Sequence, residues 1–199
     1  MEIKGKIVLI TGAGKGCGRM LAESLAEKGA VVALNDLSPI NVDEVVKKIN
    51  ARGGKAQSYI EDVAKKIGAQ VLVKSVVEDF GGIDILINHA AVEPRIPLLD
   101  MDEWDWHRTL DVNLTGAFLM MQTAGRVMRT QGHGTIMNIV AGTDDGLKKD
   151  TGAYLSSKAG LVELSRQAGN EFRPHGILVY PLENSENIIS DVLVLLEAL

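Results

Sequence analysis

The sequence predicts an α/β protein in which a parallel β-sheet of about six strands lies between two layers of helices. Two observations predict this fold class. Short apolar runs, several of them rich in Val and Ile, are typical of strands that are buried on both faces. These runs alternate along the chain with longer segments whose apolar residues recur at helical spacing. Alternating β and α units imply right-handed crossovers, and therefore one doubly wound sheet with helices on both faces.

The expected elements follow one another in regular order. The expected strands are Ile7–Thr11, Val31–Asn35, Ala56–Ile60, Ile83–Asn88, Gly134–Val140 and Ile177–Tyr180. The expected helices are Gly18–Lys28, Ile40–Arg52, Lys65–Phe80, Met101–Thr130, Ala153–Phe172 and, last, Glu183–Leu199. Boundary signals support them, since Ser38 precedes Pro39 at a helix start and Gly29 follows a helix end. Without a repeat or a linker, residues 1–199 are expected to form a single domain.

The composition narrows the function classes. Hydrophobic residues make up 46% of the 199 residues and charged residues 24%, as in ordinary globular proteins. The net charge of −5 argues against nucleic acid or an anionic membrane surface as the main partner, because both need a basic face. Cys17 is the only cysteine, and the four histidines lack metal-ligand spacing, so no metal site is expected. Without a leader or a long apolar span, the chain is expected to be cytoplasmic.

A glycine-rich loop joins the first strand to the first helix. Glycines permit a tight turn and let the backbone approach a pyrophosphate, while the helix start offers unpaired N–H groups to it. A glycine-rich turn without a ligand is the alternative, but an acidic residue, Asp36, ends the next strand, where a dinucleotide's ribose needs it. The loop residues expected to bind the cofactor are Gly12, Gly14, Lys15, Gly16, Cys17 and Gly18.

Two side chains bear on the choice of cofactor. The Asp36 carboxylate would accept hydrogen bonds from ribose hydroxyls but repel a 2′-phosphate, which favours NAD over NADP. Lys15 favours the opposite choice, because a cation beside the loop would attract a phosphate. We expect NAD, because Asp36 would face the group that distinguishes the two cofactors.

Further motifs follow the glycine loop in a fixed order. They are Asp62-Val63 after the third strand, Asn88-His89-Ala90-Ala91 after the fourth, Asn113 within a helix, and Tyr154 four residues before Lys158. Together with the glycine loop they resemble the short-chain dehydrogenase/reductase family over about residues 3–178. The resemblance implies a Rossmann fold and a nicotinamide cofactor held also by Asp62, Val63, Asn88, Ala90, Tyr154 and Lys158.

The Tyr154–Lys158 pair suits acid–base chemistry. Residues four apart lie on one face of a helix, so the two side chains are expected to be neighbours. A nearby ammonium favours the phenolate, which would move the pKa of Tyr154 towards the range needed for proton exchange with a carbonyl or alcohol oxygen. The resemblance also implies that Lys158 holds the nicotinamide ribose and that Asn113 anchors a water in a proton relay. The expected substrate is a small carbonyl compound or secondary alcohol.

The chain departs from the family pattern at two places. Ala141 occupies the position of the family's catalytic serine, counted either from Asn138 or back from Tyr154, and Thr143 is a candidate substitute. After the sixth strand, Pro181-Leu182 comes too early to be the family's Pro-Gly turn, and the substrate loop and seventh strand are expected to be missing. The first two interpretations are an NAD-dependent oxidoreductase and a catalytically impaired NAD-binding protein. A truncated or frameshifted gene is a third.

The longest helical segments predict self-association. Apolar side chains in helices 101–130 and 153–172 exceed what one sheet face needs, and they include Phe118, Leu119, Met120, Met121, Leu161, Val162 and Leu164. An isologous dimer would bury the surplus. We therefore expect a homodimer. Because the family's second interface uses the seventh strand, the assembly is not expected to reach a tetramer.

Overall fold

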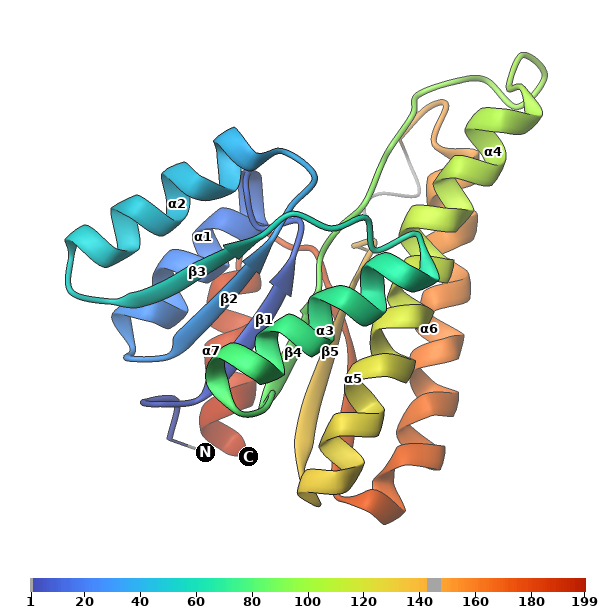
Figure 1. Cartoon of the computed structure of the whole chain (residues 1–199). Coiled ribbons are helices and arrows are strands. Elements are labelled where there is room, and N and C mark those ends of the chain that lie inside the picture. Colours follow the sequence, from blue (N-terminus) through green and yellow to red (C-terminus); the bar gives the residue numbers. More distant parts are fainter. Residues whose placement is uncertain (1, 143–147) are drawn as a thin grey trace.

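The computed structural model describes residues 2–142 and 148–199 and contains one parallel sheet (Figure 1). The strands are β1 (Ile7–Thr11), β2 (Val31–Asn35), β3 (Lys55–Tyr59), β4 (Ile85–Asn88), β5 (Gly134–Val140) and β6 (Ile177–Glu183). Their order across the sheet is β3-β2-β1-β4-β5-β6, and every adjacent pair is parallel. This arrangement confirms the doubly wound, six-stranded Rossmann fold. Strand order reverses between β1 and β4, and ligands of such sheets bind at that point, beyond the carboxyl ends of the strands.

Helices cover both faces of the sheet. On one face lie α1 (Gly16–Glu27), α2 (Pro39–Ala51) and α7 (Ile188–Ala198), and on the other α3 (Lys66–Phe80), α5 (Ala117–Gln131) and α6 (Gly152–Phe172). Successive residues of β1 supply the two cores in turn, since Val8 and Ile10 pack into the first and Leu9 into the second. That alternation follows from the two-residue period of a strand and explains why a strand between two helix layers is apolar throughout.

The long helix expected over Met101–Thr130 is divided into three parts. These are α4 (Glu103–Leu110), a π-helical turn η1 (Asp111–Gly116) and α5. Gly116 packs tightly here, because a Cβ atom on it would lie 3.3 Å from the carbonyl oxygens of Asp111 and Val63. The π turn changes the phase of the helix, and such turns often mark functional sites. The start of α4 is capped by Asp102, whose Oδ1 accepts a hydrogen bond from Asp105 N at 2.7 Å.

The end of the sheet corrects the expected boundary of the last helix. The sixth strand continues through Pro181 to Glu183, and α7 begins only at Ile188, so the helix expected from Glu183 was wrong at its start. Asn184 N donates to Val140 O at 3.0 Å, which fixes the strand's register beside β5. Because alternate residues point their N–H groups to opposite sides, Pro181 lies on the outer side of an edge strand, where its missing donor breaks no bond to β5.

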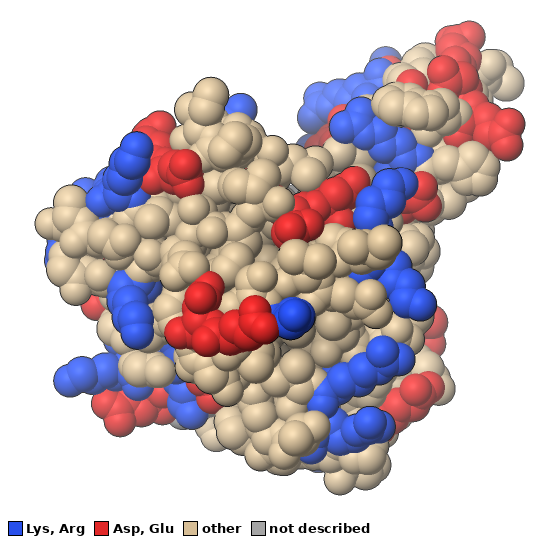
Figure 2. All heavy atoms as spheres, viewed as in Figure 1, with Lys and Arg blue, Asp and Glu red and all other residues tan. Residues whose placement is uncertain are grey.

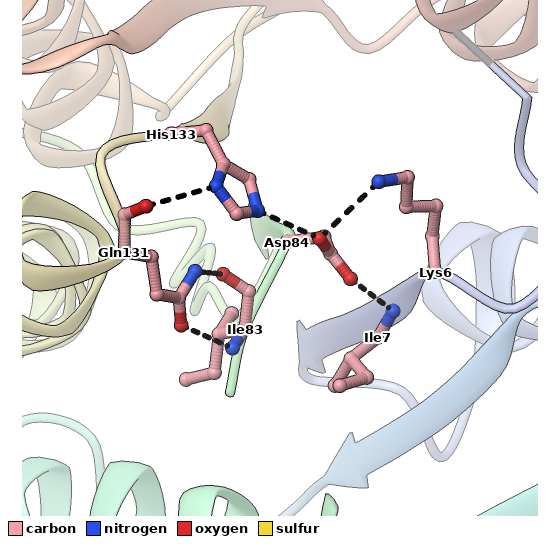
Figure 3. A network of polar contacts seen from close by, with 6 residues as sticks. All are labelled: Lys6, Ile7, Ile83, Asp84, Gln131 and His133. Atoms are coloured by element: carbon pink, nitrogen blue, oxygen red, sulfur yellow. Dashed lines mark hydrogen bonds and ion pairs between the residues drawn. The ribbon is translucent and has the colours of Figure 1, made fainter. Parts of the chain in front are cut away.

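A network of side-chain hydrogen bonds and ion pairs connects the amino ends of β1, β4 and β5 (Figure 3). Asp84 Oδ2 accepts from Ile7 N at 2.8 Å, and its Oδ1 lies 3.1 Å from His133 Nε2 and 3.4 Å from Lys6 Nζ. The side-chain amide of Gln131 both donates to Ile83 O and accepts from Ile83 N. These bonds occupy the backbone of Ile83, so β4 begins at Ile85 rather than at Ile83 as expected. The network lies at the opposite edge of the sheet from the clefts described below.

No helix in the described part of the chain is long and apolar enough to span a membrane.

Candidate functional site

Two adjoining clefts of about 410 Å³ each lie at the carboxyl edge of the sheet. They share Gly12, Asp36, Ala90, Ala91 and Val92. The outer cleft extends to Asp62, Val63 and the face of α4, and the inner cleft extends to Lys15, Gly16, Cys17, His89, Tyr154, Lys158 and Asn184. Figure 2 shows the surface indented between the part that carries α2 and the lobe that carries α4, with acidic atoms beside the indentation. Together the two clefts form an elongated groove.

Glycines let the loop after β1 pack against the loop after β4. Gly12 has φ of +66°, and a Cβ atom on it would lie 2.8 Å from the Cα of Ala90. A Cβ atom on Gly18 would overlap the carbonyl oxygen of Gly12. The first helix starts at Gly16, and Lys15 at its N-cap provides no side-chain hydrogen bond to it. The free N–H groups and positive dipole end of α1 therefore face the region expected to hold a pyrophosphate.

Asp36 lines both clefts and is held in place by two backbone groups. Its Oδ2 accepts from Gly14 N at 2.9 Å, and its Oδ1 accepts from Ser38 N at 2.9 Å. Gly14 does not line either cleft; it approaches so closely that a Cβ atom on it would lie 2.7 Å from Asp36 Oδ2. Each carboxylate oxygen retains a further acceptor site, so the fixed carboxylate can accept hydrogen bonds from ribose hydroxyls.

Asp62 and Val63 lie together in the outer cleft. Asp62 Oδ1 accepts from Ala64 N at 3.0 Å, which closes the turn that leads into α3. The preceding loop is held by Asn35, whose side chain donates to Tyr59 O at 3.2 Å and to Glu61 O at 2.9 Å. The outer cleft therefore has an apolar wall at Val63 beside a fixed carboxylate at Asp62. This pair suits the edge of a nucleotide base, which carries both apolar atoms and hydrogen-bond donors.

Asn88 and Ala90 come from the same motif but lie in different surroundings. Ala90 lines both clefts, and its N donates to Thr11 Oγ1 at 3.1 Å. Asn88 is buried beneath them, where its Nδ2 donates to Asn138 Oδ1 at 2.8 Å, and its own Oδ1 has no partner. Asn138 continues this chain by donating to Ser165 Oγ at 2.8 Å. The structure therefore places Asn88 in a core network and not among the residues that line the groove.

Tyr154 and Lys158 lie side by side on α6, and both line the inner cleft. The ammonium of Lys158 is 5.8 Å from the centre of the Tyr154 ring and donates to Ile139 O at 2.7 Å. Burial lowers the pKa of Lys158 to about 8. No carboxylate in the described residues forms an ion pair with this ammonium. Lys158 therefore places a cation and hydrogen-bond donor next to the phenol ring, as the spacing in the sequence predicts.

Asn113 lies in the π turn η1 and is fully engaged with protein groups. Its Oδ1 accepts from Val92 N at 2.8 Å, while its Nδ2 donates to Val92 O at 2.9 Å and to Ser157 Oγ at 3.0 Å. Ser157 in turn donates to Tyr154 O at 2.6 Å. The Asn113 side chain thus ties the loop after β4 to the helix that carries Tyr154, and it does not line the groove.

The remaining candidate residues are Ala141, Thr143 and Cys17. Ala141 follows β5 directly and presents only a methyl group. Thr143, its candidate substitute, lies outside the described residues. Cys17 lines the inner cleft, and burial raises the pKa of its thiol, which makes it a poor nucleophile at neutral pH. No group of His, Cys, Asp or Glu side chains suited to a metal ion occurs in the described ranges.

The structure adds lining residues that the sequence does not single out. Asn184 reaches the inner cleft because β6 extends to Glu183, and the early Pro181 hides this extension in the sequence. Trp104 is 63% exposed and lines the outer cleft, and the centre of its ring lies 5.2 Å from the guanidinium of Arg108. His89 lines the inner cleft as well.

Comparisons with known proteins agree with this geometry. The family described as short chain dehydrogenase matches residues 6–183. An uncharacterized oxidoreductase of Thermotoga maritima is 39% identical over 180 residues, which are 90% of this chain and 70% of that protein. NAD+-bound xylitol dehydrogenase is 33% identical with a TM-score of 0.87, over 92% of this chain and 71% of that chain. A metagenomic short-chain oxidoreductase in complex with NADP is 29% identical with a TM-score of 0.91, and the match covers 100% of this chain and 93% of that chain.

Proposed function

The chain belongs to the short-chain dehydrogenase family, and on that premise we propose that it is an NAD-dependent oxidoreductase acting on a small carbonyl compound or secondary alcohol. One observation carries the proposal. The fold brings Asp36, the glycine loop and the Tyr154–Lys158 pair, which are far apart in the sequence, into a single groove. A dinucleotide laid along it would have its adenosine ribose at Asp36 and its nicotinamide at Tyr154.

The groove fits a dinucleotide in shape and in chemistry. Its lining at Gly12 is backbone without a side chain, and Gly18, which lies beneath it and lines neither cleft, approaches the Gly12 carbonyl so closely that neither glycine leaves room for a Cβ atom. Its donors and acceptors match a dinucleotide in order: a carboxylate for ribose hydroxyls, a helix N-terminus for pyrophosphate, and an ammonium for the second ribose. Related structures hold NAD+ or NADP, so the preference for NAD rests on Asp36.

The proposed chemistry divides between the cofactor and two side chains. NAD, when bound, accepts a hydride from the substrate carbon or returns it. Tyr154 would take the hydroxyl proton during alcohol oxidation and give it back during carbonyl reduction. The ammonium of Lys158, close to the ring, would favour the phenolate form of Tyr154. Asn113 would act through position, because its side chain holds α6 and Val92 and only its backbone remains for a water relay.

The alternative function is dinucleotide binding with little turnover. Ala141 favours it, because a methyl group cannot donate a hydrogen bond to the substrate oxygen. Loss of one such donor costs on the order of 3 kcal/mol of transition-state stabilisation, a hundredfold or more in rate. NADP as the cofactor is a second alternative, which the cation of Lys15 in the inner cleft favours.

Comparing three forms of the protein distinguishes the oxidoreductase hypothesis from the hypothesis of dinucleotide binding with little turnover. NADH oxidation would be followed with a panel of small ketones and aldehydes in wild type, Ala141→Ser and the matched control Ala141→Ser/Tyr154→Phe. If the protein is an oxidoreductase, wild type should oxidise NADH slowly and Ala141→Ser should raise that rate by up to about a hundredfold. The double variant should lose this increase in rate. Background rates in all three forms, with NADH still bound, would overturn the oxidoreductase proposal in favour of dinucleotide binding.

A further inference from the structure

His89 occupies the wall of the inner cleft between the glycine loop and Lys158, and the proposed chemistry does not use it. Its backbone N donates to Thr11 Oγ1 at 3.1 Å, which fixes the start of the loop after β4. Its ring Nδ1 lies 3.2 Å from the carbonyl oxygen of Gly12. Gly18 leaves room for the ring, since a Cβ atom there would lie 2.8 Å from Nδ1.

These contacts decide the protonation of the ring. The Gly12 carbonyl can only accept a hydrogen bond, so Nδ1 must carry the hydrogen. Burial lowers the pKa of His89, and the nearby charge of Lys158 lowers it further, so the imidazole is neutral at pH 7. The other nitrogen, Nε2, is then a pure acceptor. It has no hydrogen-bond partner among the described residues, and it is not one of their fully buried unpaired atoms.

An accessible acceptor in this cleft selects a particular ligand group. Phosphate oxygens are themselves acceptors, so Nε2 is unsuited to the pyrophosphate and requires a donor such as a ribose hydroxyl. His89 lines the inner cleft with Tyr154 and Lys158 and does not line the outer cleft, which holds Asp62. The inner cleft also contains Asp36, but the Lys158 ammonium acts on the pKa of His89 more strongly than the Asp36 carboxylate does. The ring therefore lies towards the end of the cleft expected to hold the nicotinamide half of a bound dinucleotide.

We propose that His89 is a cofactor-binding residue whose Nε2 accepts a hydrogen bond from a hydroxyl of the nicotinamide ribose. The proposal rests on the proposed function, because it requires the nicotinamide half to lie beside Tyr154. The same ring has a second task at Nδ1, where its bond to Gly12 O ties the glycine loop to the loop after β4.

Two substitutions separate these tasks. An Asn amide reaches about as far as Nδ1, so His89→Asn keeps a donor to Gly12 O but removes the acceptor at Nε2. A Gln amide reaches about as far as Nε2, so His89→Gln keeps that acceptor and gives up the bond to Gly12 O. Affinity for NADH, followed by its fluorescence, would be compared with affinity for ADP, which lacks the nicotinamide ribose. Circular dichroism would confirm that each variant is folded.

We expect His89→Asn to bind NADH about fivefold more weakly than wild type and ADP equally well, as loss of one hydrogen bond predicts. We expect His89→Gln to keep the wild-type ratio of NADH to ADP affinity while binding both ligands more weakly. Unchanged NADH affinity in His89→Asn, or equal losses for NADH and ADP, would overturn the proposal and leave the proposed function standing. Failure of the wild-type protein to bind NADH would overturn both.

Discussion

Asp36 determines the expected preference between the two nicotinamide cofactors. Its carboxylate is already fixed by Gly14 N and Ser38 N, so it can accept ribose hydroxyls without reorganisation and would repel a 2′-phosphate. We expect the wild-type protein to bind NADH more tightly than NADPH, and Asp36→Ala to narrow the difference by about tenfold or more, since hydrogen bonds to charged groups contribute about 1.5–3 kcal/mol. Fluorescence titration measures both affinities. Lys15→Ala is the matched control, because it should weaken NADPH more than NADH and so widen the difference that Asp36→Ala narrows. Equal wild-type affinities would refute the assignment.

The buried ammonium of Lys158 is expected to lower the stability of the folded protein at neutral pH. Its pKa falls from 10.5 to about 8 on burial, so below pH 8 the folded state carries the cost of a buried charge. Between pH 8 and 10.5 the unfolded chain still binds the proton and the folded protein does not, so stability rises with pH across this window by on the order of 3 kcal/mol.

Lys158→Met therefore unfolds at a higher urea concentration than wild type at pH 7, and the difference shrinks by pH 10. The gain is smaller than the full burial cost, because Met cannot donate to Ile139 O as Lys158 does. Urea unfolding followed by circular dichroism at the two pH values tests this. A variant as unstable as wild type at pH 7, or with the same rise in stability towards pH 10, would contradict the burial argument.

At the scale of elements, the glycine loop is the most constrained part of the site. A Cβ atom on Gly18 would overlap the Gly12 carbonyl, whereas one on Gly16 meets nothing within 4 Å. Gly18→Ala must therefore displace the loop and is expected to weaken NADH binding by at least tenfold. Gly53→Ala, the matched control outside both clefts, adds only the strain of an alanine at φ of +83°, about 1 kcal/mol or slightly more, because nothing lies within 4 Å of its Cβ position. Similar NADH affinities in the two variants would show that loop packing does not shape the site.

The elements differ in how far the sequence predicts them. Three strands, β1, β2 and β5, have the expected bounds, because each is a mostly apolar run with a glycine or a charged residue within two positions of its end. The π turn η1 is not predictable, since helical spacing alone cannot reveal one extra residue in a turn. The continuation of β6 through Pro181 is not predictable either, because it depends on the strand's place at the sheet edge.

The residues of the candidate site also differ in how far the sequence predicts their positions. Asp36 and the Tyr154–Lys158 pair are predicted from spacing, because the strand ends and the helix turn fix where those side chains lie. Asn88 is expected at the cofactor but lies in the core network, since its motif specifies a strand end and not the side on which the side chain packs. The involvement of His89 depends on its distance to Gly12 O, which only the folded structure provides.

For the whole molecule, the expected homodimer remains a prediction. A cleft of about 170 Å³ between α5 and α6 is lined by Phe118, Leu164 and Phe172, and Phe118 is 41% exposed. A second copy packed against this face would remove those side chains from water. We expect light scattering coupled to size exclusion to report a dimer at tens of micromolar and Phe118→Asp to report a monomer.

The matched control for this prediction is Val194→Asp on α7. Val194 is 62% exposed and lies on the other side of the sheet, so this variant should remain dimeric. A wild-type monomer would refute the association, and a Phe118→Asp dimer would place the interface elsewhere.

The account as a whole requires one extended dinucleotide along the two clefts, and a crystal structure of the protein with NAD+ tests this most directly. We predict adenine beside Val63, the adenosine ribose on Asp36, the pyrophosphate at the start of α1, and the nicotinamide ribose within hydrogen-bonding distance of Lys158 and His89. Density for the whole cofactor in that order would support the oxidoreductase. Density that ends at the pyrophosphate, with the nicotinamide half disordered or directed away from Tyr154, would contradict the central claim.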